Sequence, residues 1–240
     1  MPAGVVRRRW LLARVPTWVL ASAAARAAGG DLAVTCDTTL APALRKVADA
    51  YKARFGGHVF IFATGPGLIL PQLVREIQND IVVTQTAILE QAAQAGVIAA
   101  PVRAQWRNPL VIAGRAGAAT TDGAFAVPDP SPASDIDGPA VLARLAISPA
   151  RTLGAVDTDE VAFLLTTGAA QAGLLHMTDV RADARLVAVR PVPAEAQPPP
   201  LYAAAVTRLA RRPNPEGFVA FLTTKEAGDI LAAAGLEAIT

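Results

Sequence analysis

Two short threonine-containing turns are the parts of the sequence best suited to binding chemistry. Thr38 and Thr39 follow the apolar run 32–36, and Thr64 and Gly65 follow the apolar run 58–63. Each turn precedes a stretch whose apolar residues recur at helical spacing, so each is predicted to open a helix. The first turn of a helix presents unpaired backbone N–H groups and a partial positive charge, which attract a small anion. The pattern therefore predicts an anion-binding protein.

Strands and helices alternate around these turns. A buried strand is expected at 32–36 and further strands at 58–63 and 80–84, and a helix is expected after each of them. Three successive strand–helix units predict a parallel sheet covered by helices. Ligands of such sheets bind beyond the carboxyl ends of the strands, which is where both threonine turns lie.

After residue 108 this alternation changes, which indicates a second lobe. Its helices are expected at 139–146 and 160–166, and its later strands at 173–176 and 186–189. The proline-rich segment 191–200 is predicted to be a surface connector, because proline cannot pair in a central strand. A returning strand at 201–206 and a helical region at 215–234 follow.

Residues 1–28 have the order of a secretory signal peptide, with basic residues first, an apolar middle at 15–25 and a small-residue cleavage position near Ala27. The run from Arg7 to Arg9 also resembles a twin-arginine signal, so the general and the twin-arginine export routes both stay open. We therefore expect a periplasmic protein. Cys36 is the only cysteine, which excludes an intrachain disulfide, and it is expected to be buried in a strand.

The charge of the chain is divided unevenly between this leader and the remainder. The 240 residues include 22 basic and 20 acidic side chains, a net charge of +2. Five of the basic side chains and none of the acidic ones lie within residues 1–28, so the remainder has 17 basic and 20 acidic side chains, a balance of −3. Without a basic run to neutralise a row of phosphates, nucleic acid is excluded as a partner.

The order of several short motifs resembles the periplasmic molybdate-binding protein of ABC importers, over nearly the whole chain after the leader. The matching segments are Thr39-Leu40, 62–65, Leu68, Gln72-Leu73, 80–83, Asp129-Pro130, Pro132-Ala133, 173–176, Asp179, 202–204 and Gly235-Leu236. The resemblance implies an α/β, two-lobed periplasmic solute-binding fold of type II. In this fold each lobe is a mostly parallel sheet flanked by helices, and the ligand cleft lies between the lobes. We expect lobe 1 at 29–108 plus 207–240, and lobe 2, including the hinge strands, at 109–206.

Carried to individual positions, the resemblance implies six ligand-binding residues. They are Thr39, Thr64, Gly65, Ala133, Thr158 and His176. Thr39 and either Thr64 or Gly65 stand where the family has serines, and Ala133 and Thr158 would supply backbone donors. His176 stands where the family has a tyrosine, and as a protonated donor it would strengthen anion binding as the pH falls toward about 6.

Carboxylates are expected to stay away from the ligand. A dianion such as molybdate presents only acceptor oxygens, so its site needs converging N–H and O–H donors and no nearby carboxylate. Asp80, Asp129 and Asp179 are therefore predicted to cap turns or hinge segments. Asp157 is predicted to complement the dipole of the helix that it precedes rather than to bind a metal.

These observations predict a protein that binds a small oxyanion, with molybdate or tungstate first, and delivers it to the membrane permease of an ABC importer. We expect a monomer without a cofactor or a metal ion. Three alternatives stay open: the same fold binding another small anion or an organic acid, a sensor or interaction module that has lost transport, and a small periplasmic enzyme. The enzyme would use His176 with Asp179 or Asp157, although the sequence contains no G-x-S-x-G, H-E-x-x-H or Walker motif.

Overall fold

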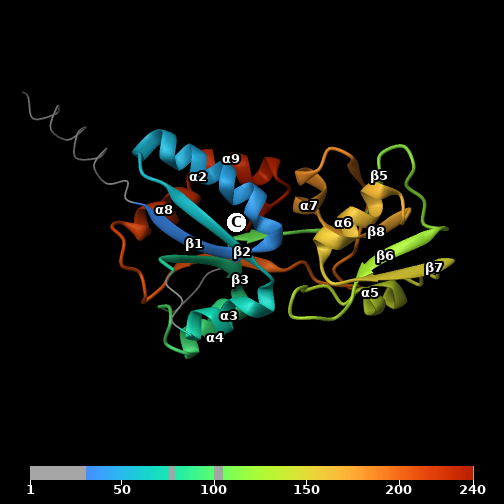
Figure 1. Cartoon of the computed structure of the whole chain (residues 1–240), viewed down its shortest axis with the longest axis horizontal. Helices are drawn as coiled ribbons and strands as arrows, with labels where there is room; N and C mark the ends of the chain where they lie inside the picture. The colour runs from blue at the N-terminus through green and yellow to red at the C-terminus, as the bar shows by residue number, and fades with distance from the viewer. Residues whose placement is uncertain (1–30, 76–78, 100–104, 240) are drawn as a thin grey trace, which may run out of the picture.

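The computed structural model describes residues 31–75, 79–99 and 105–239. The predicted leader at 1–28 and its cleavage position near Ala27 lie outside the described residues. Two lobes lie side by side, and each is built on its own mixed sheet with helices on both faces (Figure 1). The predicted two-lobed α/β fold is confirmed, but the sheets mix parallel and antiparallel pairs and are not mostly parallel as expected. In the part of the chain that the structure describes, no helix is both long and apolar enough to cross a membrane.

The first lobe contains a six-stranded sheet. Its strands, in sheet order, are β11 (Glu237–Ala238), β4 (Trp106–Arg107), β10 (Leu201–Val206), β3 (Ile81–Gln85), β1 (Leu32–Asp37) and β2 (Val59–Thr64). β1 pairs in parallel with β2 and β3, whereas β10 is antiparallel to β3. One face is covered by α2 (Ala41–Phe55), α8 (Pro215–Leu222) and α9 (Lys225–Ala233), and the other by α3 (Pro66–Val74) and α4 (Thr86–Gln94).

The second lobe contains a five-stranded sheet. Its strands, in sheet order, are β7 (Arg151–Ala155), β6 (Ala124–Pro128), β8 (Ala172–His176), β5 (Leu110–Arg115) and β9 (Leu186–Pro191). β6 pairs in parallel with β7 and β8, and β5 is antiparallel to its two neighbours. Helix α5 (Gly138–Arg144) covers one face, and α6 (Thr158–Thr167) and α7 (Met177–Ala182) cover the other.

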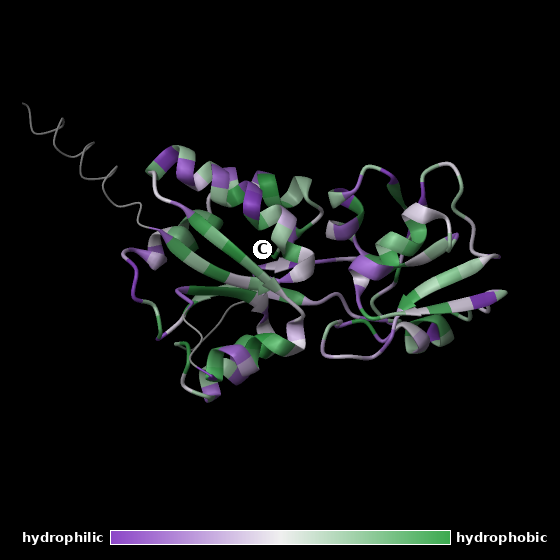
Figure 2. Ribbon diagram, in the orientation of Figure 1, coloured by the Kyte–Doolittle hydropathy of each residue, from purple (hydrophilic) through white to green (hydrophobic). Residues whose placement is uncertain are grey.

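The central strands are buried on both faces because helices cover both sides of each sheet. All six residues of β1 and all five of β8 are buried, and Cys36 lies in β1 as predicted. Figure 2 shows the corresponding apolar strands between helices whose outer surfaces are polar. These rigid strands fix the positions of the residues that follow their carboxyl ends.

The chain crosses between the lobes twice, between β4 and β5 and between β9 and β10. Asn108, in the first crossing, is fully buried, and its N–H donates to the carbonyl of Pro200 in the second crossing at 3.2 Å. The sequence-based division placed 201–206 with lobe 2, whereas this strand, β10, pairs with β3 and β4 in the sheet of the first lobe.

Hydrogen bonds join the two lobes across the cleft. They run from Thr39 Oγ1 to Asp179 Oδ1 at 2.7 Å, from the Gly67 N–H to the Pro132 carbonyl at 3.0 Å, and from Gln85 Nε2 to Asp135 Oδ2 at 2.9 Å. The structure therefore describes a closed arrangement of the lobes.

Several elements were not predicted from the sequence, among them strands β5 and β6 of the second lobe and four others. Strands β4 and β11 have two residues each and α7 has six, which is too short for a periodic pattern. Strand β7 is a sheet edge whose first residues, Arg151 and Thr152, are exposed, so it lacks the apolar pattern of a buried strand.

Candidate ligand-binding site

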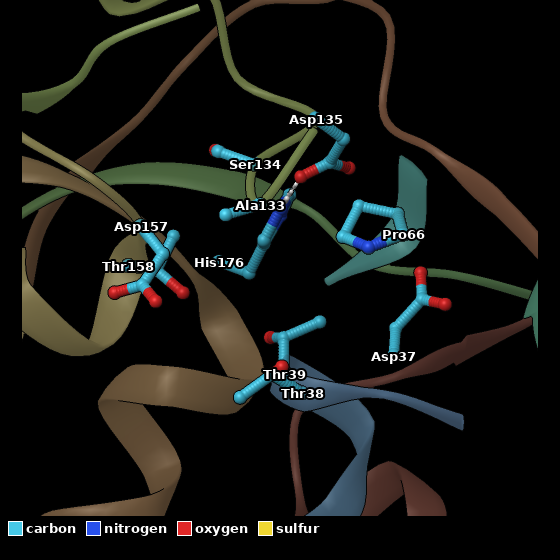
Figure 3. Close-up of a pocket in the computed structure, with 10 residues that line it drawn as sticks. All are labelled: Asp37, Thr38, Thr39, Pro66, Ala133, Ser134, Asp135, Asp157, Thr158 and His176. Atoms are coloured by element: carbon cyan, nitrogen blue, oxygen red, sulfur yellow. Dashed lines mark hydrogen bonds and ion pairs between the residues drawn. The ribbon is translucent and has the colours of Figure 1, made fainter. Parts of the chain in front are cut away.

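A small cavity lies between the two lobes. It is lined by Asp37, Thr38, Thr39 and Pro66 of the first lobe and by Ala133, Ser134, Asp135, Asp157, Thr158 and His176 of the second. Figure 3 shows these two groups on opposite sides of the same space. The volume open to the centre of a water-sized sphere is about 20 Å³. A cavity of this size holds a small ion or one or two water molecules, and a larger solute requires the lobes to separate.

The first side of the cavity is built where β1 enters a helix. Residues Thr38–Leu40 form a single 3-10 turn, and α2 follows directly with Pro42 in its first turn, where the missing N–H costs no hydrogen bond. The backbone N–H groups of this turn have no intrahelical partners. The Thr38 side chain makes no hydrogen bond with a described residue, so its hydroxyl stays available to a ligand.

Thr39 lines the cavity as predicted, but its hydroxyl already donates a hydrogen bond within the protein. Thr39 Oγ1 donates to Asp179 Oδ1 at 2.7 Å and lies 2.6 Å from Thr178 Oγ1. Thr178 Oγ1 in turn accepts a hydrogen bond from Asn108 Nδ2 at 2.8 Å. A hydroxyl has one proton, so this chain of bonds makes Thr39 a bridge between the lobes rather than a free donor.

Thr64 and Gly65 do not line the cavity. The Thr64 hydroxyl accepts a bond of 3.4 Å from Gln72. Gly65 lies against the opposite lobe, since a Cβ at this position would be 2.7 Å from the Cα of Ala133. The second predicted turn therefore supplies a close contact between the lobes, and its cavity-lining residue is Pro66.

Ala133 and Thr158 line the cavity from the second lobe. The Ala133 N–H donates to Ser131 Oγ at 3.1 Å and is not free for a ligand. Thr158 is the first residue of α6, so its N–H has no intrahelical partner. Asp157 caps this helix as predicted, accepting a bond of 3.0 Å from the Glu160 N–H, and it also reaches the cavity.

His176, at the end of β8, forms the charged centre of the second-lobe side. Its side chain is fully buried, and Nε2 lies 2.9 Å from Asp135 Oδ1. Burial opposes protonation, but the charge and hydrogen bond of Asp135, with Asp179 and Asp37 nearby, raise the pKa of His176 to about 9. The pKa of Asp135 is lowered, because the imidazolium outweighs the effect of burial. Near neutral pH the site therefore contains an ion pair, and the other ring nitrogen, Nδ1, has no hydrogen-bond partner among the described residues.

Asp37 is the buried acid of the first-lobe side, and it was not identified from the sequence. It is 1% exposed, and its Oδ1 accepts a short hydrogen bond from the Thr84 hydroxyl. Its Oδ2 is buried and has no partner in the described part of the chain. Burial raises the pKa of Asp37 to about 8, Asp135 adds to this increase, and Thr84 and His176 oppose it.

The expectation of a carboxylate-free site is wrong. Asp37, Asp135 and Asp157 all line the cavity, and His176 is the one basic side chain among its lining residues. Asp179, in contrast, has the capping role that was predicted: it accepts the His176 N–H at 3.0 Å at the start of α7, and it also accepts the Thr39 hydroxyl. Its burial raises the pKa of Asp179 to about 6. Among the described residues, these acids form no group of three or more ligands that could hold a metal ion.

Asp80 also has the structural role that the sequence predicted. Its carboxylate accepts the Ala33 N–H at 2.8 Å and pairs with Arg212 at 3.0 Å, far along the strand from the cavity. These bonds lower the pKa of Asp80 against the effect of burial.

Comparison with known proteins gives this arrangement its context. Residues 32–237 match the family model described as bacterial extracellular solute-binding protein. None of the curated proteins matches the chain.

Several solved structures share the fold at low sequence identity. The periplasmic molybdate-binding protein of Azotobacter vinelandii is 18% identical, with a TM-score of 0.72 over 87% of this chain and 100% of its own. The sulfate-binding protein SubI of Mycobacterium tuberculosis is 14% identical, with a TM-score of 0.69 over 88% of this chain and 87% of its own. L-phospholactate-bound PEB3, a protein of Campylobacter jejuni, is 15% identical, with a TM-score of 0.64 over 86% of this chain and 99% of its own.

The family match spans both lobes and both crossings between them, and the cavity lies at the junction that this architecture creates. The chain belongs to the bacterial extracellular solute-binding proteins.

Proposed function

We propose that this protein captures a small oxyanion between its lobes in the periplasm and delivers it to the permease of an ABC importer. The observation that carries the proposal is the buried, protonated His176, which lines the cavity and whose Nδ1 has no partner among the described residues. The N-termini of two helices also border this cavity. A buried cation and helix N-termini attract an anion, and the low-dielectric surroundings strengthen each interaction. The protein acts as a monomer after removal of a signal peptide near Ala27.

Molybdate and tungstate are the first candidate ligands. The motifs Thr39-Leu40 and Gly173 to His176 resemble the molybdate-binding family, and a molybdate-binding protein shares the fold. The ligand contacts then come from Thr38 and the backbone of Thr39 on one side, and from the Thr158 N–H and His176 on the other. Thr64, Gly65 and Ala133 support closure around the ligand instead of donating to it.

The carboxylates favour a second candidate, an anion or organic acid that carries its own proton. Asp157, and Asp37 when it is ionised, are acceptors in the wall of the cavity, and a proton-free dianion offers an ionised carboxylate no proton to bind. A protonated oxyanion presents both acceptors and a donor. Inorganic phosphate is the simplest ligand of this kind.

An enzymatic role is less well supported. His176 Nε2 pairs with Asp135, not with Asp179 or Asp157 as the enzyme alternative required. We propose binding without turnover, so any bound ligand should be recovered chemically unchanged.

Isothermal titration of the mature protein, from about Ala28 onward, tests the function directly. Molybdate, tungstate, sulfate and inorganic phosphate are each titrated near neutral pH in metal-depleted buffer. Saturable binding of at least one of them, at one site per chain, supports the proposal. A folded protein that binds none of the four contradicts the proposed oxyanion function and redirects attention to organic acids.

A further inference from the structure

Two residues that line the cavity from opposite lobes each have a buried polar atom for which the described residues provide no hydrogen-bond partner. These atoms are Asp37 Oδ2 in the first lobe and His176 Nδ1, which carries a proton, in the second. Both residues are at most 1% exposed. Burying a polar atom without a hydrogen bond costs about 1–3 kcal/mol, so two such residues at one cavity point to a ligand that satisfies both.

The two atoms require different things of that ligand. His176 Nδ1–H needs an acceptor oxygen, which every oxyanion supplies. Asp37 Oδ2 needs a proton, because two anionic oxygens at hydrogen-bond distance repel each other. That proton comes either from the anion or from the solvent, and only a protonated anion brings it.

We propose that Asp37 shares one proton with the bound oxyanion and thereby discriminates between anions that carry a proton and anions that do not. This inference rests on the proposed function and makes Asp37 a specificity-determining residue within it. For hydrogenphosphate, the ionised Asp37 accepts the proton of the ligand. For sulfate or molybdate, a protonated Asp37 donates its proton from Oδ2. The complex contains the same single shared proton in either case.

The surroundings of Asp37 are suited to this exchange. Thr84, on β3, donates to Oδ1 and leaves Oδ2 as the free position. Burial and the charge of Asp135 disfavour the ionised form of Asp37, while the Thr84 hydrogen bond and His176 favour it. Cys36, the preceding residue, stays protonated because burial and Asp37 raise its pKa. The result is a pKa of about 8 for Asp37, close enough to neutrality for both protonation states to be populated.

The two ligand classes should therefore respond differently to pH. Above about pH 8, a proton-free anion must bind together with a proton from the solvent, which lowers its affinity tenfold per pH unit. Hydrogenphosphate carries its proton throughout this range. Loss of the His176 proton near pH 9 weakens both classes alike, so the ratio of the two affinities isolates the contribution of Asp37.

The experiment measures the affinities of inorganic phosphate and sulfate between pH 7.5 and 9.5, with molybdate as a second proton-free probe. We expect the phosphate-to-sulfate affinity ratio to rise by about tenfold or more across this range. In Asp37→Asn the ratio should stay constant within about twofold. Asp49→Asn, which removes the same charge from an exposed position on α2, should retain the wild-type rise.

Each outcome decides a separate point. A ratio that stays constant in the wild-type protein overturns the shared proton, whether or not the Asp37→Asn variant folds. If Asp37→Asn folds and its phosphate-to-sulfate affinity ratio still rises with pH as in the wild type, another group supplies the proton. That result also overturns the role proposed for Asp37. If no oxyanion binds at any pH, the proposed function itself fails, whereas binding with a constant ratio leaves that function intact.

Discussion

The two sides of the cavity have the same backbone arrangement but differ in the partners of their titratable side chains. On each side a fully buried central strand, β1 or β8, ends in a titratable residue and leads directly into a helix. His176 at the end of β8 has a charged partner in Asp135, and Asp179 accepts its backbone N–H. Asp37 at the end of β1 has one neutral donor, Thr84, and its other oxygen finds no partner in the part of the chain that the structure describes.

This difference separates two tasks that one site must perform. A buried charge with an ion-pair partner keeps its charge and geometry, so the β8 end can provide a constant electrostatic attraction. A buried acid without a charged partner changes its protonation state easily, so the β1 end can respond to the ligand. We therefore interpret the second lobe as the side that attracts and the first lobe as the side that discriminates.

Substitution of His176 should give the largest effect, because it removes the attracting side. In His176→Ala the part-buried Asp135 loses its cation, and breaking a pair of this kind costs up to about 3–5 kcal/mol of stability when both partners are fully buried. We expect oxyanion affinity to fall by about 100-fold or more by titration calorimetry. His58→Ala is the matched control, since His58 is mostly exposed, and it should change neither stability nor affinity appreciably. An unchanged affinity in a folded His176→Ala protein would remove β8 from the ligand set.

Thr39→Val should have the next largest effect, because it cuts the bridge between the two strand ends. Asp179 would lose a hydrogen bond to a charged acceptor, which is worth about 1.5–3 kcal/mol and favours the closed arrangement. We expect oxyanion affinity to fall by about 10-fold to 100-fold. Thr167→Val, on the exposed surface of α6, is the control. Equal affinities in the two variants would show that the bridge does not contribute to closure.

Gly65→Ala tests closure without altering a polar group. The added Cβ would stand 2.7 Å from the backbone of Ala133, so the lobes could not approach fully. Overpacking of this kind costs about 1–3 kcal/mol, and we expect affinity to fall by about tenfold. Small-angle scattering should report a more open protein. Gly228→Ala, where an added Cβ meets no atom within 4 Å, should bind like the wild type.

The smallest expected effect concerns the pH dependence of the ligand-free protein. The pKa of His176 is raised from 6.5 to about 9, so its stabilising contribution is complete below pH 6.5 and is lost as the pH rises to about 9. The raised pKa of Asp37 acts in the same direction between about pH 4 and 8. We expect Tm to fall by about 3 °C or more between pH 6.5 and 9. A constant or rising Tm in calorimetry would mean that the β8 pair is not charged as described.

The fold was predictable because its signals are local. The apolar runs and helical periodicity along 32–55 identify β1 and α2, and similar patterns identify most other elements of both lobes. Four of the six predicted site residues, Thr39, Ala133, Thr158 and His176, line the cavity. Whether they bind a ligand stays a prediction.

The chemistry of the site was less predictable because it depends on distant partners. Asp135 lies in an irregular loop, 41 residues before His176, and no sequence pattern predicts the contact between them. The hydroxyl of Thr39 is occupied by Asp179, 140 residues away. Asp37 did leave a signal, since it directly follows an apolar run and precedes two threonines, but an acid at that position also fits an ordinary turn.

The small volume of the closed cavity has a consequence for the time that a ligand stays bound. No solute larger than a small ion can pass while the lobes touch, and leaving requires the bonds from Thr39, Gly67 and Gln85 to break together. The dissociation rate should then be set by the opening of the lobes and should be similar for chemically different ligands. Differences in affinity among these ligands would then lie in the association rate, because this rate depends on the fraction of encounters that end in closure of the lobes. A docked permease that separates the lobes would accordingly release any bound ligand at once.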